Sequence, residues 1–168
     1  MTKTLYHFTN VHHWDSIQAD GQINVTESNV GSISPWLPPY GEHVGPDVVW
    51  LTDTTSSRGL ALEPPLHVYE PHERDAATAF CQAEGTFDKK AVRLTVELPE
   101  DECHQWRRWV KRYDMNPEWK RIFQSGREPY RWWVIERPIL LSEIVDVLVT
   151  HDERLEGPEV RGPLFVNA

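Results

Sequence analysis

The chain has 168 residues and a formal net charge of −9, and its 39% hydrophobic and 26% charged residues are typical of a folded globular protein rather than a disordered one. This length suits one domain, which we expect over residues 1–151, followed by a polar tail over residues 152–168. No run of about 18 apolar residues is present and no long apolar segment follows Lys3, so we expect no membrane-spanning helix, no secretory signal and a cytoplasmic location.

The first predicted elements are a strand over residues 3–8 and a helix over residues 11–20. Asn10 is a favourable N-cap for that helix and Gly21 is a favourable residue to end it. The apolar residues Val11, Trp14 and Ile17 recur at helical spacing and predict the face that packs on the core. A short strand over residues 22–26 and a long loop rich in proline and glycine, over residues 27–46, follow.

Four further strands are predicted, over residues 48–52, 91–98, 130–136 and 144–149. In the second of these, hydrophobic residues alternate and place one face on the core, namely Val92, Leu94, Val96 and Leu98. Helices are predicted over residues 74–83, from Pro99 to about Tyr113, and from Asn116-Pro117 to near Gly126. The pattern predicts a single α+β domain with about six strands and three to four helices.

The end of the first predicted strand carries the strongest functional signal, in the run Leu5-Tyr6-His7-Phe8-Thr9-Asn10. Strand alternation places His7 and Thr9 on one side, and we expect Tyr6 and Phe8 on the opposite, core-directed side. An imidazole and a hydroxyl aimed into one space suit a ribose or an amide edge. The alternative is an exposed strand end whose threonine serves the following turn.

Two later strands carry further polar positions, at Trp50, Thr52 and Glu136. Alternation places Glu136 on one face with Trp132 and Val134. Glu136 is either a catalytic carboxylate or the partner of an arginine where the strand ends.

A basic, aromatic region extends from residue 103 to residue 137. It holds nine basic and four acidic residues, a local charge of +5, and five of the eight tryptophans of the chain. This composition predicts either a surface for a phosphate-bearing partner or a pair of amphipathic helices with solvated arginines and buried tryptophans. The acidic balance of the whole chain argues against indiscriminate binding to nucleic acid.

The order of these pieces, over residues 5–136, resembles the ADP-ribosyltransferase superfamily. In that family a histidine-x-threonine or serine element, a central strand with an aromatic residue and a late glutamate line one NAD pocket. The opening Tyr6-His7-Phe8-Thr9 looks most like the toxin branch that modifies DNA, and the RNA 2′-phosphotransferases are similar in the same places. The resemblance implies a split sheet, mixed or antiparallel, of about six strands.

The resemblance also implies site residues, NAD as the cofactor and no metal. Glu136 and His7 would be catalytic. The residues expected to contact NAD are His7, Phe8, Thr9, Trp50, Thr52 and Arg58. The residues expected to contact the acceptor are Arg107, Arg131 and Trp132. The arginine that some branches place on the pyrophosphate would be Arg58 or Arg131.

We therefore expect an NAD-dependent enzyme, acting as a monomer or in an oligomer, that transfers ADP-ribose to a nucleic acid or protein acceptor. Two alternatives differ in their requirements. A non-catalytic interaction or inhibitor protein on the same scaffold would bind its partner through residues 103–137. An enzyme that removes a 2′-phosphate from RNA with NAD would require basic residues near His7.

Overall fold

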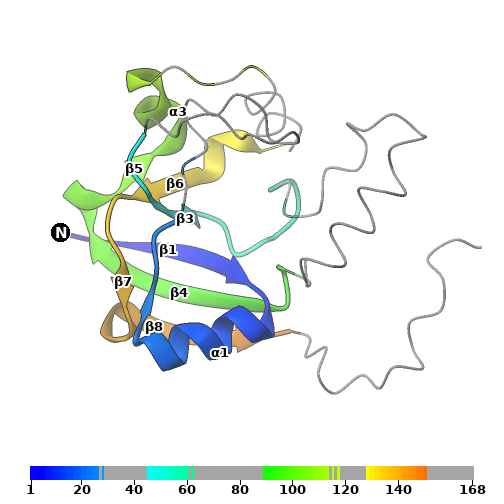
Figure 1. The fold of residues 1–168 in the computed structure, drawn as a ribbon. Helices are drawn as coiled ribbons and strands as arrows, with labels where there is room; N and C mark the ends of the chain where they lie inside the picture. Colours follow the sequence, from blue (N-terminus) through cyan, green and yellow to red (C-terminus); the bar gives the residue numbers. More distant parts are fainter. Residues whose placement is uncertain are drawn as a thin grey trace, which may run out of the picture.

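The protein contains a six-stranded sheet with the strand order β5-β6-β3-β1-β4-β8 and a separate two-stranded sheet of β2 and β7 (Figure 1). The structure is a computed structural model and describes residues 1–26, 28, 45–60, 62, 89–113, 115, 117 and 128–150. Every strand pair within these residues is antiparallel, so the sheet is antiparallel rather than mixed. The α+β class that we expected is confirmed.

The elements have the following bounds. The strands are β1 (Thr2–Thr9), β2 (Gln22–Ile23), β3 (Val49–Thr52), β4 (Val92–Pro99), β5 (His104–Gln105), β6 (Trp132–Ile135), β7 (Ile139–Leu140) and β8 (Ile144–Val149). The α-helices are α1 (Val11–Asp20) and α3 (Trp106–Trp109). Short 3₁₀ helices cover Glu100–Glu102, Val110–Arg112, Pro129–Arg131 and Leu141–Glu143.

The predicted N-terminal strand and helix are confirmed, including both ends of the helix. Asn10 has an extended backbone, and its side-chain oxygen accepts a hydrogen bond of 2.7 Å from the backbone N–H of His13. Gly21 ends the helix in the left-handed conformation with φ 76°, which a residue with a Cβ atom rarely adopts. Local sequence signals were sufficient here because both caps act within four residues of the helix.

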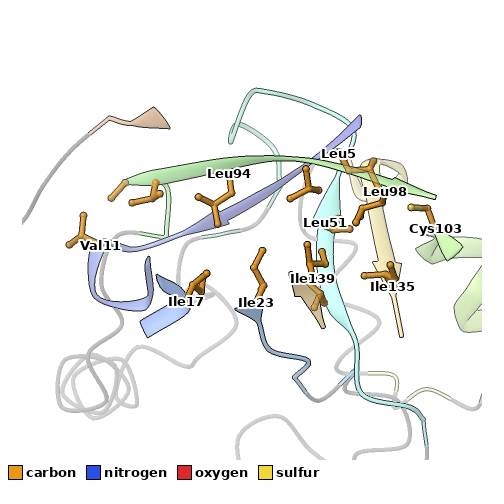
Figure 2. Packing of buried hydrophobic residues seen from close by; sticks show 14 residues of the cluster. Leu5, Val11, Ile17, Ile23, Leu51, Leu94, Leu98, Cys103, Ile135 and Ile139 are labelled. Carbon is orange, nitrogen blue, oxygen red and sulfur yellow. The ribbon is translucent and has the colours of Figure 1, made fainter. Parts of the chain in front are cut away.

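The predicted alternation in β4 is also confirmed, since all four of its core positions are fully buried. They belong to a first core cluster formed by Leu5, Val11, Ile17, Ile23, Val49, Leu51, Ala91, Val92, Leu94, Val96, Leu98, Cys103, Ile135 and Ile139. Figure 2 shows Ile17 of α1, Ile23 of β2 and Ile139 of β7 lying against the sheet residues of this cluster. The helix and the small sheet therefore cover one face of the large sheet.

A second core cluster covers the other face and is rich in tryptophan. Its buried members are Val48, Leu60, Trp106, Trp109, Trp132 and Val134. Val134 and Ile135 are neighbours on β6 but belong to different clusters, as strand alternation requires. The half of the large sheet that contains β3 and β6 is thus packed on both faces, and Phe8 near the end of β1 packs against the second cluster as well.

Packing on both faces overturns our prediction for β1. Leu5 is fully buried and Thr9 is 4% exposed, so the side that carries His7 and Thr9 faces the first core cluster. Tyr6 and Phe8 are half-buried, and Phe8 packs against the second cluster. The prediction assumed that one face of β1 packs on the core and that the other face is exposed to solvent. This assumption fails for a strand that is covered on both sides.

The predicted helix from Pro99 to Tyr113 is wrong. Residues Glu100–Glu102 form one 3₁₀ turn, and the backbone becomes extended at Cys103 with φ −91° and ψ 120°. The strand β5 follows and pairs with β6 at the edge of the sheet. The helix α3 begins only after Gln105, whose side chain accepts a hydrogen bond of 3.2 Å from the N–H of Arg108. Pairing with a strand far away in the sequence therefore overrides the local helical pattern.

Other predicted elements differ in length or lie outside the described residues. The second strand is shorter than expected, and β6 ends at Ile135, so Glu136 follows the strand instead of lying in it. The strand β7 was not predicted. The described residues contain two α-helices instead of three to four. The predicted helices over residues 74–83 and 116–126 (apart from Pro117), most of the 27–46 loop and the tail over residues 152–168 fall outside them.

Within the described part of the chain, no helix is long and apolar enough to cross a membrane.

We predict that Leu94→Ala lowers the free energy of unfolding by about 2–5 kcal/mol, because the truncation leaves a cavity in the first core cluster. Leu94 is fully buried in the middle of β4. Urea denaturation followed by circular dichroism measures the loss. The matched control is Leu148→Ala on β8, where the side chain is 41% exposed and the expected loss is below about 1 kcal/mol. Equal losses in the two variants contradict this assignment of the core.

Candidate functional site

The large sheet is held together weakly between β1 and β3. Eight residue pairs join β1 to β4, and four join β3 to β6. Only one pair, Tyr6 with Thr52, joins β1 to β3. The sheet therefore consists of two halves, β1-β4-β8 and β3-β6-β5, which separate beyond Tyr6.

His7 bridges the two halves where the backbone pairing ends. Its Nδ1 lies 2.9 Å from the carbonyl oxygen of Trp50 on β3. A carbonyl oxygen only accepts hydrogen bonds, so Nδ1 carries the proton and donates it. The imidazole thus gives Trp50 a hydrogen bond at a position where β1 does not continue the ladder.

This hydrogen bond fixes the chemical state of the His7 ring. Burial lowers the pKa of His7, and the nearby charges of His13 and Lys89 lower it further, although the bond to Trp50 acts in the opposite direction. The ring is therefore neutral near pH 7 with its proton on Nδ1, which leaves Nε2 as a hydrogen-bond acceptor. Such an acceptor suits a hydroxyl donor.

Glu136 lies directly after the end of β6 and is exposed. Its Oε1 accepts a hydrogen bond of 2.6 Å from Nε1 of Trp109, whose side chain is 1% exposed. The indole therefore orients the carboxylate from a rigid position in the second core cluster. The sequence analysis considered buried tryptophans in this region as one alternative but did not predict this contact.

The expected arginine partner at the end of β6 is absent for Glu136 among the described residues, but the neighbouring Arg137 forms such a network. Its guanidinium donates to Glu102 at 2.6 Å and to Glu143 at 2.7 and 2.8 Å. These contacts tie the end of β6 to the 3₁₀ helices on either side of it. Glu136 is left with the indole as its described partner.

His7 and Glu136 lie at the same end of the sheet. β1 and β6 are each antiparallel to β3, so they run in the same direction and both end at one edge. One strand separates β1 from β6, which corresponds to about 10 Å for two strand spacings. The register aligns Tyr6 with Trp132 through Thr52, so Glu136 also lies three residues, about 10 Å, farther along its strand than His7. The ends of β1 and β6 thus lie at one edge of the sheet, and the convergence of His7 and Glu136 on one ligand stays a prediction.

The two side chains approach this edge from opposite faces. His7 alternates with Leu5 and Thr9 and pairs with Leu94, so it belongs to the face of the first core cluster. Glu136 contacts Trp109 on the face of the second cluster. A ligand that touches both must lie across the open end of the split between β1 and β3.

Trp50 and Trp132 pack against each other on the face of the large sheet that also carries Glu136. The ring centroids of Trp50 and Trp132 are 5.9 Å apart in an edge-to-face contact, and those of Trp50 and Trp106 are 6.4 Å apart. Trp132 is 9% exposed and so forms part of the core, whereas Trp50 is half-buried.

Other residues predicted to contact the cofactor have structural roles or lie apart. Phe8 packs on the second core cluster. Thr52 is fully buried, and its hydroxyl accepts a hydrogen bond of 3.4 Å from the N–H of Thr54 in the turn after β3. Arg58 is exposed in the segment that follows this turn. Thr9 is buried on the same face of β1 as His7.

The predicted arginines differ in their availability. Arg131 donates to Glu128 and, at 3.2 Å, to Asp53, and these contacts raise its pKa. Asp53 also accepts a hydrogen bond of 3.1 Å from Nε1 of Trp133. Arg131 is therefore engaged in linking the turn after β3 to the start of β6. Arg107 is exposed on α3.

The described segments show no metal site, and the one hollow given for them lies away from His7. No three histidine, cysteine, aspartate or glutamate side chains among these residues are grouped to hold a metal ion. A shallow hollow of about 450 Å³ is lined by Met1, Glu100 and Asp101, at the opposite end of β1 from His7. This hollow lies far from the candidate site and contributes nothing to it.

Comparisons with models of known protein families, with curated proteins and with solved structures found no match for this chain. The candidate site is therefore interpreted from its own geometry.

We predict that the free energy of unfolding decreases as the pH falls from about 7 to about 5, in part because of His7. The folded-state pKa of His7 lies below its ordinary value of 6.5, so the unfolded chain binds more protons in this range and is favoured by acid. One such group contributes at most about 1.4 kcal/mol per pH unit. Urea denaturation at several pH values measures the slope.

The test variant for this effect is His7→Gln, because a glutamine N–H can still donate to Trp50 but does not titrate. It should reduce the slope of stability against pH, and the remaining slope includes His13, whose pKa burial also lowers. A slope identical to that of the native protein removes His7 from this role.

Proposed function

We propose that this protein is an NAD-dependent ADP-ribosyltransferase whose dinucleotide lies across the open end of the split between β1 and β3. The observation that supports this most directly is the placement of His7. Its neutral imidazole is held by the Trp50 carbonyl oxygen with Nε2 left as an acceptor, at the same sheet end as Glu136. The resemblance seen in the sequence supplies the reaction class.

The reaction cleaves the bond between nicotinamide and ribose. Nicotinamide leaves with the bonding electrons, the ribose carbon develops oxocarbenium character, and an acceptor nucleophile bonds to that carbon and loses its proton. In the proposal, His7 Nε2 accepts a hydrogen bond from a ribose hydroxyl. Glu136 places negative charge beside the developing cation, an interaction stronger in the transition state than in the ground state.

The hydrogen bond from Trp109 makes Glu136 suitable for this task. A carboxylate fixed by a buried indole needs little reorganisation when charge develops next to it. Trp50, on the same face, is positioned as the wall against which the nicotinamide ring would pack.

We predict that the protein binds NAD and releases nicotinamide from it, and that Glu136→Gln slows turnover about 10²–10³-fold with little change in NAD affinity. Calorimetry measures binding, and chromatography measures released nicotinamide. Glu97→Gln is the matched control, because Glu97 is exposed on β4 and distant from the split. Absence of NAD binding at millimolar concentration contradicts the proposed function, and unchanged turnover in Glu136→Gln removes that residue from its role.

The acceptor surface in this proposal is a basic patch formed by α3 and the 3₁₀ turn that follows it. Its side chains are all exposed, and none forms an ion pair with a described residue: Arg107, Arg108, Lys111 and Arg112. Trp109 lies within this segment, and its buried indole connects the segment to Glu136. Clustered cations on an otherwise acidic chain suit a phosphate-bearing or acidic acceptor.

We predict that Arg107→Glu/Arg108→Glu lowers the ratio of ADP-ribose transferred to acceptor over NAD hydrolysed by at least about tenfold, because two attractive charges become repulsive. Labelled NAD with candidate DNA, RNA and protein acceptors measures this ratio. The neutral variant Arg107→Gln/Arg108→Gln should fall between the native protein and the double glutamate variant. Transfer that is insensitive to both variants and to salt places the acceptor elsewhere.

The non-catalytic alternative loses part of its basis in the structure. Trp106, Trp109 and Trp132 are buried in the second core cluster, so they offer no exposed aromatic surface to a partner. The exposed arginines of the basic patch are common to both functions. Nicotinamide release from NAD distinguishes the two.

A further inference from the structure

The exposed apolar side chains of the described residues are concentrated on and beside one strand. Apart from Met1 and Tyr130, the exposed large hydrophobic side chains all fall within residues 140–149, namely Leu140, Val145, Val147, Leu148 and Val149. All of these except Leu140 lie on β8. Single exposed apolar residues are ordinary on a protein surface, whereas a contiguous group of them indicates an interaction site.

The strand β8 forms one edge of the large sheet. It pairs with β4 on one side, and none of the described strands pairs with its other side (Figure 1). Natural edge strands are commonly protected from a further strand by lysine, proline, another charge or a bulge. In β8 the irregular register at Val145 and the charge of Asp146 affect the first half only, and Val147–Val149 has no such protection.

The hydrogen bonds to β4 show which backbone groups of β8 point outward. The N–H of Thr150 donates to the carbonyl oxygen of Ala91 at 2.8 Å, so the backbone groups of Thr150 point toward β4. These groups alternate in direction along an antiparallel strand, so those of Val149 and Val147 point away from β4. The backbone groups of the two valines are therefore directed at the position of a further strand.

A strand added beside β8 would cover apolar side chains on both faces of the sheet. Val147 lies opposite Leu94, which is fully buried in the first core cluster. Val149 lies opposite Val92 of the same cluster, so both valines continue that face to the edge. Leu148 alternates with these valines and lies on the opposite face.

A second copy of β8 fits this edge because the strand is complementary to itself in the antiparallel direction. A two-fold axis at Leu148 pairs this residue with its own copy and pairs Val147 with Val149 of the second copy. The outward backbone groups of the two valines then meet as a hydrogen-bonded pair. Asp146 comes opposite Thr150 of the second copy, so apolar residues pair with apolar residues and polar residues with polar ones.

The two ends of β8 are also complementary in charge. The hydroxyl of Thr150 donates to the carbonyl oxygen of Lys90 at 3.0 Å, and Lys89 precedes Lys90, so this end of the sheet carries two lysines. The antiparallel arrangement brings Asp146 of each copy toward the lysine-bearing end of the other copy. A register centred on Asp146 is disfavoured, because it places two like charges directly opposite each other.

We propose that two copies of this chain associate through β8 into a two-fold dimer in which the large sheets join edge to edge. β5 lies at the opposite edge of the large sheet, so the pairing leaves β5 and the adjoining helix α3 uncovered. One short strand from each copy makes less than a standard interface, so we expect weak association, with monomers at about 5 µM and dimers at about 500 µM. The dimer does not depend on the proposed function.

Analytical ultracentrifugation of the full chain over this concentration range tests the dimer. Leu148→Lys should weaken self-association at least about tenfold, because two like charges then face each other at the axis. Leu148→Glu should have the same effect for the same reason. An equimolar mixture of the two variants should restore dimers, because a lysine of one copy then faces a glutamate of the other.

The matched control is Leu140→Lys, which makes the same substitution at a side chain that is 50% exposed but lies on β7. This control should associate as the native protein does, and circular dichroism should show that all variants are folded. A native chain that stays monomeric, dimers that persist in Leu148→Lys and Leu148→Glu, or a mixture that stays monomeric overturns the proposal.

Amide hydrogen exchange measured by NMR tests the pairing without any substitution. The amides of Val147 and Val149 should exchange several-fold more slowly at about 500 µM than at about 50 µM, because the second copy accepts their hydrogen bonds. The amide of Leu148, which points toward β4, should change less. Exchange at Val147 and Val149 that does not depend on concentration overturns the dimer, including the case in which residues of the same chain cover this edge.

Discussion

The hydrogen bond from His7 to the Trp50 carbonyl oxygen is the constraint on which the site depends. Two half-sheets meet through a single backbone pair, and beyond it the imidazole replaces a ladder hydrogen bond. If β1 continued to pair with β3, the sheet would close and His7 would have no polar role. Because the strands part there, one side chain both completes the hydrogen bonding of β3 and presents a neutral nitrogen at the opening.

Packing on both faces of the sheet gives this opening rigid walls. The first core cluster fixes the face of His7 through α1 and the small sheet, and the second fixes the face of Glu136 through its tryptophans. The indole of Trp109 therefore has two roles, since it fills the core and orients the carboxylate. Trp106, Trp109 and Trp132 of the basic region are buried for this reason, while the arginines of α3 are exposed at the surface.

Short-range signals in the sequence predicted the fold well, and long-range pairing did not follow from them. The strand β1, the helix α1 with both caps, the core face of β4 and the strand β8 each depend on residues within a few positions of one another. The segment after Pro99 has the composition of a helix, yet His104 and Gln105 pair with Val134 and Trp133 on β6. Residues 104–105 adopt a strand because they pair with β6, about 30 positions later in the sequence. No local sequence pattern around residues 104–105 predicts this pairing.

For the candidate site, too, some features follow from local sequence signals and others depend on long-range packing. The family resemblance implied one pocket for His7, Trp50 and Glu136, and the antiparallel order places the ends of β1 and β6 at one edge of the sheet. Which face each side chain occupies depends on how many layers cover the sheet, and this is a property of the whole packed domain. The cations illustrate the point: an arginine is the expected phosphate ligand by residue type, but Arg131 lies between two carboxylates. The contacts of Arg131, rather than its residue type, therefore decide whether it is available to a phosphate.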